Sequence, residues 1–409
     1  MYHLLRTRFE NNGCEYIGYR LLAATNHKMK IAVITPDMSN NATMRAYWLA
    51  DFLSHNHEVH IIGPQFGDGI YPVVPDDIPL EPTAASPIVP RFLPVMSELV
   101  DDISADLVIA VKPRVSSYGT ALWHRRRHGT PLMLDIDDWE IGFRLDGGYL
   151  KAAVLALPSL AHVNGIGWLA MFERLVRYAD GVTVSNPWLR DRFGGEEVVH
   201  PRDTDMWNPE RFTQDEARSR LDLPADDNIV MFLGKPLAQK GTGDLVDAAL
   251  IGDPPAWSLH LVGGSTEQFG PSDRIRGASH ITVHGLQPYD RAPLWIAAAD
   301  VMVVPQRAMP SARGQLPAKI FDAMSMGKPL VTTEVGPIPA IVGDAAEIIP
   351  PADPFRLRQA IDDLVASPMT REALGRRGKS RFERKYAPER LRETLEAAVQ
   401  SAVSRTDAR

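Results

Sequence analysis

The stretch from Gly314 to Pro339 contains residues that could bind phosphate and ribose. Unpaired N–H groups and the helix dipole at the start of a helix beginning near Pro317 would attract a phosphate. Asp322 could accept hydrogen bonds from both hydroxyls of a ribose, and the alternative is a solvated acid that stabilises the dipole. The pattern predicts that this helix ends at Gly327. Its buried face would consist of Ile320, Phe321, Met324 and Ser325.

Two lysines follow a predicted strand from Asn228 to Leu233. Beyond Gly234, Lys235 and Lys240 lie in the loop that leads to the next predicted helix. Fixed ammonium groups in a partly dry site would stabilise the negative charge that a departing diphosphate gains. For each lysine taken alone, an ordinary solvated loop position is the alternative.

Four acids occur within six residues at the end of a predicted strand: Asp135, Asp137, Asp138 and Glu140. We expect Asp137 or Asp138 to contact a sugar or an acceptor. A solvated strand end is the alternative, and a divalent metal site is a weaker one.

Two further loops would reach the same edge of the sheet. Lys112 and Arg114 follow the predicted strand 107–111 and could receive an anionic acceptor, although a basic pair in a loop is more often solvated. Asn40 and Asn41 could admit a sugar or a phosphate, because asparagine tolerates positive φ. The loop around them, 36–43, has no glycine, which argues against a dinucleotide-binding GxGxxG motif.

Short apolar runs alternate with amphipathic stretches along the chain, which predicts parallel sheets covered by helices on both faces. The first series of predicted strands covers 31–35, 58–62, 107–111, 132–136 and 181–184. A second series covers 228–233, 258–262, 281–283, 300–304 and 329–333. Ligands of such sheets bind beyond the carboxyl ends of the strands, where the candidate residues above are found.

The polar, proline-containing segment 201–227 separates the two series. We therefore expect an α/β protein with two Rossmann-like domains whose parallel sheets face each other across a central cleft. The N-terminal domain would cover 29–205 and the C-terminal domain 206–385. A helix at 386–409 would pack back on the N-terminal domain, and residues 1–28 would be a poorly ordered extension.

Composition excludes several other classes of protein. The 409 residues carry a net charge of −7 with a pI near 6.0, which does not favour nucleic acid as a partner. A single cysteine, Cys14, rules out an intrachain disulfide and favours the cytoplasm. There is no run of about 18 apolar residues, so we expect no membrane span. The basic cluster 125–128 offers peripheral contact with the inner membrane face as a weaker alternative to helix-dipole stabilisation.

The motifs together resemble glycosyltransferase family 4, whose fold is GT-B. The segment from Asp322 to Leu330 resembles the second half of the family's E-x7-E and AMA-x-G-x-P-V-V signature, and Asp300 to Pro305 resembles its ADVFVLPS strand. The segment from Phe232 to Gly241 resembles the G-R-L…K-G motif, with Lys235 in the place of the arginine. The first glutamate of the signature is replaced by Gly314.

The resemblance implies a retaining glycosyltransferase that takes a sugar from a UDP- or GDP-linked donor. It implies that Lys235 and Lys240, beside Gly234, bind the diphosphate and that Asp322 binds the ribose. Residues of a P-x-K-x-x-E/D variant of the motif would lie near the donor sugar or phosphate: Gln315, Pro317 and Lys319. No metal or other cofactor is expected, and the acceptor stays open between polysaccharide, lipid and small molecule.

Two alternatives accompany this interpretation. One is a GT-B nucleotide-sugar epimerase, which would need its own acid and base. The other is a nucleotide-sugar-binding protein with weak catalysis, because Gly314 offers no carboxylate to the donor sugar.

Overall fold

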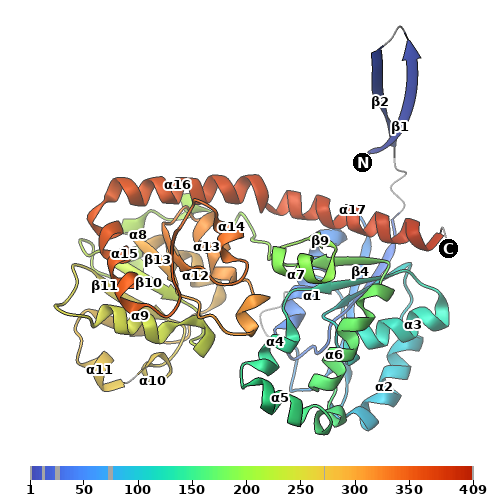
Figure 1. The fold of residues 1–409 in the computed structure, drawn as a ribbon, viewed down its shortest axis with the longest axis horizontal. Coiled ribbons are helices and arrows are strands. Elements are labelled where there is room, and N and C mark those ends of the chain that lie inside the picture. Colours follow the sequence, from blue (N-terminus) through green and yellow to red (C-terminus); the bar gives the residue numbers. More distant parts are fainter. Residues whose placement is uncertain (1, 12–13, 24–27, 72–76, 271, 408–409) are drawn as a thin grey trace.

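The computed structural model describes residues 2–11, 14–23, 28–71, 77–270 and 272–407. The sequence predicts little regular structure before Met29, but the backbone there forms a hairpin. Its strands β1 (Tyr2–Asn11) and β2 (Cys14–Ala23) are antiparallel, with Tyr2 opposite Ala23. The hairpin stands apart from the rest of the chain (Figure 1).

The N-terminal domain is built on a parallel sheet of seven strands in the order β5-β4-β3-β6-β7-β8-β9. Apolar and β-branched residues fill its central strands, and β6 and β7 are buried along their whole length, as expected for a sheet covered on both faces. The strands are β3 (Lys30–Ile34), β4 (Glu58–Gln65), β5 (Leu80–Ala84), β6 (Leu107–Val111), β7 (Leu132–Ile136), β8 (Gly181–Val184) and β9 (Glu196–Glu197).

Helices cover both faces of this sheet (Figure 1). They are α1 (Ala42–Ser54), α2 (Val89–Asp102), α3 (Thr120–His128), α4 (Glu140–Leu145), α5 (Tyr149–Leu155), α6 (Ile166–Leu175) and α7 (Pro187–Phe193). Helix α4 begins directly after the acids that follow β7, so the fold places those acids at the carboxyl end of the sheet.

The C-terminal domain repeats the design with six parallel strands in the order β12-β11-β10-β13-β14-β15. The strands are β10 (Ile229–Leu233), β11 (Ser258–Val262), β12 (Ile281–His284), β13 (Val301–Val304), β14 (Leu330–Thr333) and β15 (Glu347–Ile349). Its helices are α8 (Gln214–Arg220), α9 (Thr242–Ala249), α10 (Thr266–Phe269), α11 (Ser272–Arg276), α12 (Ala292–Ala298), α13 (Ala318–Ser325), α14 (Ile338–Val342), α15 (Pro354–Ala366) and α16 (Pro368–Lys385). The two sheets confirm the predicted α/β architecture of two Rossmann-like domains.

The last helix, α17 (Pro388–Asp407), leaves the C-terminal domain and lies along the N-terminal domain (Figure 1). It contacts α1 and β8 there. The buried Glu396 carboxylate lies 3.0 Å from both the His57 Nε2 and the Asn56 Nδ2, which fixes the helix to the end of α1.

Candidate functional site

Three lysines gather at the carboxyl end of β10, around Gly234. Lys235 follows the strand, Lys240 ends the short 3-10 turn Ala238–Lys240, and Lys319 lies in the first turn of α13. A Cβ placed on Gly234 would be 3.7 Å from the Lys240 Nζ and 3.8 Å from the Lys319 Cε. The side chains of Lys240 and Lys319 therefore meet next to the glycine. We call Lys235, Lys240 and Lys319 the lysine cluster.

The lysine cluster concentrates positive charge that the protein only partly neutralises. Burial and then the charges of Lys319 and Lys235 lower the pKa of Lys240 to about 8. Within the described residues, neither Lys235 nor Lys240 forms an ion pair, while Lys319 lies 3.0 Å from the Asp322 Oδ2. A buried ammonium group whose charged form is disfavoured by burial and by neighbouring cations is stabilised by an anion beside it. The site therefore suits a ligand with several negative charges.

Gly241 makes the position of Lys240 possible. Its φ is +62°, and a Cβ there would lie 1.8 Å from the carbonyl oxygen of Pro305. Only glycine fits so close to the end of β13 in a left-handed conformation. The tight turn at Gly241 starts α9 and leaves the Lys240 side chain directed to Gly234.

Helix α13 agrees closely with its prediction. It begins after Pro317, and Gly327 beyond its end has φ +63°. The predicted buried face is confirmed at every position: Ile320, Phe321, Met324 and Ser325. Gln315 and Pro317 lie half-buried before the helix, and the Gln315 Oε1 accepts a hydrogen bond from Gln306 at 3.4 Å.

Asp322 is more enclosed than the sequence predicts. Its side chain is fully buried and forms ion pairs with Lys319 and with Arg202, which comes from the segment between the domains. The Arg202 guanidinium also lies over the rings of Trp48 and Trp207, at 5.8 and 5.7 Å from their centroids. A ribose could use this carboxylate only if one of the two cations gave way. The sequence does not single out Arg202, because nothing local links it to a residue 120 positions away.

Gly314, in the position of the family's first glutamate, lies at the contact between the domains. A Cβ on it would be 2.5 Å from the Trp139 Cβ and 3.1 Å from Trp188, both in the N-terminal domain. The Gly314 carbonyl accepts a hydrogen bond from the Asn186 Nδ2 at 3.0 Å. Close packing of the two domains thus explains the glycine, since even a methyl group would not fit between Gly314 and Trp139.

The acids after β7 converge on one buried lysine. The Lys112 Nζ lies 2.7 Å from Asp137, 2.9 Å from Asp138 and 2.9 Å from Glu140. Lys112 has φ +66°, an uncommon conformation outside glycine, and this strained turn brings its ammonium group under the three carboxylates. We call Lys112, Asp137, Asp138 and Glu140 the acid cluster.

Within the acid cluster the carboxyl groups have different pKa values. Burial would raise the pKa of Asp137, but the Lys112 and Arg45 cations outweigh it and lower the pKa to about 2. For Asp138, burial and the charges of Asp137 and Glu140 outweigh Lys112 and raise the pKa to about 6. The Asp138 side chain is also the most exposed of the three carboxylates, at 22%. Asp138 is therefore the member best placed to meet a ligand.

The remaining candidates of the N-terminal domain are engaged or differ from expectation. Lys112 and Arg114 are predicted to receive an anionic acceptor, but both cations are already paired, Arg114 with Glu140 through an Nε–Oε2 contact of 3.1 Å. Asn40 and Asn41 are exposed, yet neither has positive φ, and the Asn40 Oδ1 caps the backbone N–H of Ala42. The loop thus keeps an ordinary helix-start conformation.

Asp135 belongs to the core of its domain. Its carboxylate receives two hydrogen bonds of 2.8 Å from Arg45 and one of 2.7 Å from Thr183. Arg45 also donates to the carbonyls of Val198 and Val199, where the chain leaves the domain. This buried pair stabilises the exit of the interdomain segment.

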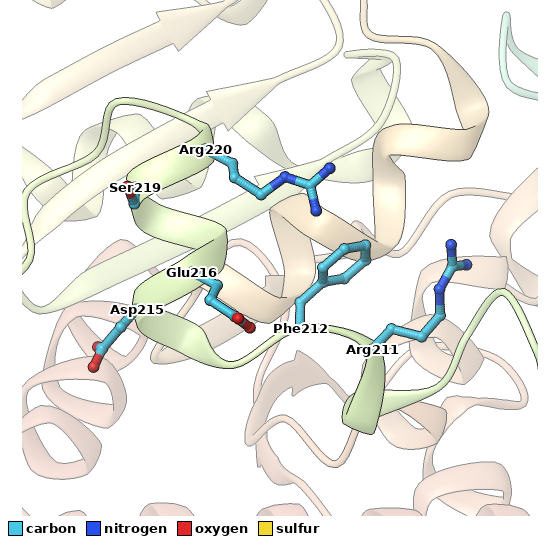
Figure 2. Close-up of a pocket in the computed structure, with 6 residues that line it drawn as sticks. All are labelled: Arg211, Phe212, Asp215, Glu216, Ser219 and Arg220. Carbon is cyan, nitrogen blue, oxygen red and sulfur yellow. The ribbon is translucent and has the colours of Figure 1, made fainter.

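A surface pocket of about 430 Å³ lies elsewhere, at the start of α8. Figure 2 shows Phe212 between Arg211 and Arg220, whose guanidinium carbons are 5.3 and 5.0 Å from the ring centroid. Its lining contains no member of the lysine cluster or the acid cluster: Arg211, Phe212, Asp215, Glu216, Ser219 and Arg220. We assign it no part in the site.

The part of the chain that carries the lysine cluster is similar in sequence to known glycosyltransferases. Residues 227–367 match the family model described as "Glycosyl transferases group 1". A curated relative, the D-inositol 3-phosphate glycosyltransferase of Streptosporangium roseum, is 27% identical over 49% of this chain and 51% of its own length. The matches with three curated relatives span 36%, 51% and 61% of their lengths, so the chain covers less than two thirds of each.

Solved structures extend the likeness in fold to both domains. A sucrose-phosphate synthase from Thermosynechococcus elongatus is 19% identical, with a TM-score of 0.69 over 91% of this chain and 98% of the other. HepE of Anabaena, solved in complex with UDP-glucose, is 18% identical, with a TM-score of 0.68 over 91% of this chain and 100% of its own. Residues 227–367 are therefore similar to the glycosyl transferases group 1 family, within a chain that has the two-domain GT-B fold.

Proposed function

We propose that the protein is a glycosyltransferase that moves a sugar from a UDP- or GDP-linked donor to an acceptor hydroxyl. The observation that carries the proposal is the lysine cluster around Gly234, inside the segment that matches the glycosyl transferases group 1 model. A nucleotide diphosphate would supply the negatively charged partner that Lys235 and Lys240 do not have within the described residues. HepE, which has a similar fold, was solved in complex with UDP-glucose.

Transfer with retention of the anomeric configuration fits the resemblance to family 4. The bond from the acceptor oxygen to the anomeric carbon forms on the face from which the diphosphate leaves, and the acceptor proton passes to the departing phosphate oxygen. Lys240 and Lys235 would stabilise the charge that grows on the diphosphate. Asp138 would contact the sugar or the acceptor from the opposite domain.

We also propose that no divalent metal takes part, since the lysine cluster provides the positive charge that a metal would otherwise supply to the diphosphate. Transfer, or donor hydrolysis in the absence of acceptor, should then continue unchanged in EDTA. A loss of activity that Mg²⁺ or Mn²⁺ restores would contradict this part of the proposal.

The decisive experiment is calorimetric titration with UDP, GDP and their sugars, followed by a donor-hydrolysis assay. We expect one nucleotide to bind, and its sugar to be hydrolysed slowly without acceptor and faster when a suitable acceptor is added. Binding without turnover over a broad acceptor panel would favour the binding protein that Gly314 suggests. Conversion of the donor to an isomeric nucleotide sugar would favour the epimerase.

A further inference from the structure

A cluster of exposed apolar side chains lies on the N-terminal domain, on and after the short helix α5. We call it the α5 patch. Its most exposed members are Leu150 at 80%, Leu157 at 78% and Val154 at 67%. Tyr149 and Leu155 complete it, and Leu160 and Met171 extend it onto the following helices. Monomeric soluble proteins rarely expose so many neighbouring apolar side chains without a partner.

The stretch that carries the α5 patch contains charge of one sign only. Residues 147–172 contain no aspartate or glutamate, and Lys151 is their one lysine or arginine. Arg144 and Arg174, exposed on either side of this stretch, add two more positive charges. This is unusual in a chain whose net charge is −7.

The acids nearest to the patch in sequence each have a partner within the protein. Glu140 is held by Lys112, and Glu173 pairs with Arg192 at 2.8 Å. The Asp146 carboxylate accepts a hydrogen bond from the backbone N–H of Ser311 in the C-terminal domain. The apolar surface is thus bordered by cations and by compensated acids.

This combination suits an anionic lipid bilayer better than a protein surface. The centres of protein interfaces are enriched in aromatic residues, whereas the three most exposed side chains here are aliphatic and lie on a two-turn helix and the turn after it. Leucines on one face with lysine and arginine beside them are typical of segments that lie in a membrane interface. The cations would gain from the negative surface potential of such a membrane.

We propose that the α5 patch inserts into the surface of an anionic lipid bilayer. The contact is peripheral, because α5 has seven residues and none of the helices in the described part of the chain is long and apolar enough to cross a membrane.

The α5 patch is connected to the acid cluster through α4. Helix α4 joins the acid cluster to α5 and packs against the loop 311–313 of the C-terminal domain. In Figure 1, α4 and α5 lie on the side of the N-terminal domain that is nearest to the C-terminal domain. Bilayer contact at α5 would hold the site close to the lipid surface. The acceptor hydroxyl would then belong to a lipid or a lipid-linked molecule, a step that rests on the proposed function.

The test is flotation of the full chain with vesicles of phosphatidylglycerol and phosphatidylcholine, compared with phosphatidylcholine alone. Wild type should float with the anionic vesicles. The double variant Leu150→Asp/Leu157→Asp should partition at least about tenfold more weakly. The matched control is Phe355→Asp/Met369→Asp, which changes two apolar residues of the C-terminal domain that are 71% and 79% exposed and should float like wild type. Equal flotation of all three proteins would overturn the proposal.

Two further measurements separate bilayer binding from self-association. Lys151→Glu/Arg174→Glu should weaken flotation with the anionic vesicles and leave the protein monomeric in light scattering. A wild type that ignores vesicles but forms dimers, which Leu150→Asp/Leu157→Asp separates, would identify a second copy as the occupant and refute bilayer binding. Donor binding and donor hydrolysis, measured without vesicles, should be the same in all these variants and report on the proposed function separately.

Discussion

The lysine cluster and the acid cluster occupy matching places in the two domains but differ in how their charges are compensated. Each follows the carboxyl end of a central strand, β10 in one domain and β7 in the other. In the acid cluster three carboxylates share the Lys112 ammonium group at 2.7 to 2.9 Å. In the lysine cluster, burial and repulsion lower the pKa of Lys240. The uncompensated charge of the lysine cluster indicates a ligand-binding site, whereas the compensated charge of the acid cluster indicates a role in stability first.

Loss of Lys112 should destabilise the protein more than loss of any member of the lysine cluster. Lys112→Met leaves three buried carboxylates without their common cation, so it should lower the free energy of unfolding by about 3–5 kcal/mol at pH 7. The loss should shrink toward pH 5, because the stranded carboxyl groups can then take up protons. Urea unfolding at both pH values checks this. Lys385→Met, on the exposed end of α16, should unfold like wild type. Equal stability of the two variants would mean that the acid cluster is solvated.

Removal of Lys240 should affect ligand binding and not stability. Measured without added nucleotide, the free energy of unfolding of Lys240→Ala should equal that of wild type or be slightly higher, since the change relieves repulsion within the lysine cluster. It should weaken binding of the nucleotide diphosphate by about 1.5–3 kcal/mol, or roughly 10- to 150-fold in Kd. Calorimetric titration measures this, with Lys385→Ala as the matched lysine control. Unchanged affinity would remove Lys240 from the site.

The contact between the domains offers a third comparison. Gly314→Ala should cost about 1–3 kcal/mol of stability, because its Cβ would meet the Trp139 Cβ at 2.5 Å. In the background of Trp139→Gly the same change should cost much less. A thermal-unfolding double-mutant cycle reports the coupling between the two positions. Additive effects would show that the domains do not pack in this way in solution.

The smallest expected effect is on the pH dependence of donor binding. Lys240 has a pKa lowered to about 8, so its charge is present below that pH and is lost as the pH rises through it. Binding of the diphosphate should weaken about fourfold between pH 7 and pH 8.5. Lys240→Arg should bind with no such decline, since arginine stays charged. A wild-type affinity that is flat up to pH 9 would contradict the assignment.

Local sequence patterns predicted most of the fold. They failed where the structure depends on contacts between residues far apart in the sequence. The alternation of apolar runs gives the central strands, and the spacing in α13 gives its buried face correctly at Phe321 and Met324. The edge strand β9 consists of Glu196 and Glu197, and glutamate has a low preference for strands. These residues form a strand because they pair with β8. Likewise, the lysine pair is visible in the motif after β10, but the packing of Trp139 on Gly314 depends on the approach of two domains.

The path of α17 has a consequence for how the two halves can move. The chain passes between the domains twice, once near Arg202 and again between α16 and α17, where the Tyr386 hydroxyl is anchored to the Ile341 carbonyl at 3.1 Å. Each crossing is fixed to the C-terminal domain, the first by the ion pair of Arg202 with the buried Asp322 and the second by Tyr386. Any change in the arrangement of the domains would therefore have to be absorbed by the short segments next to these two contacts.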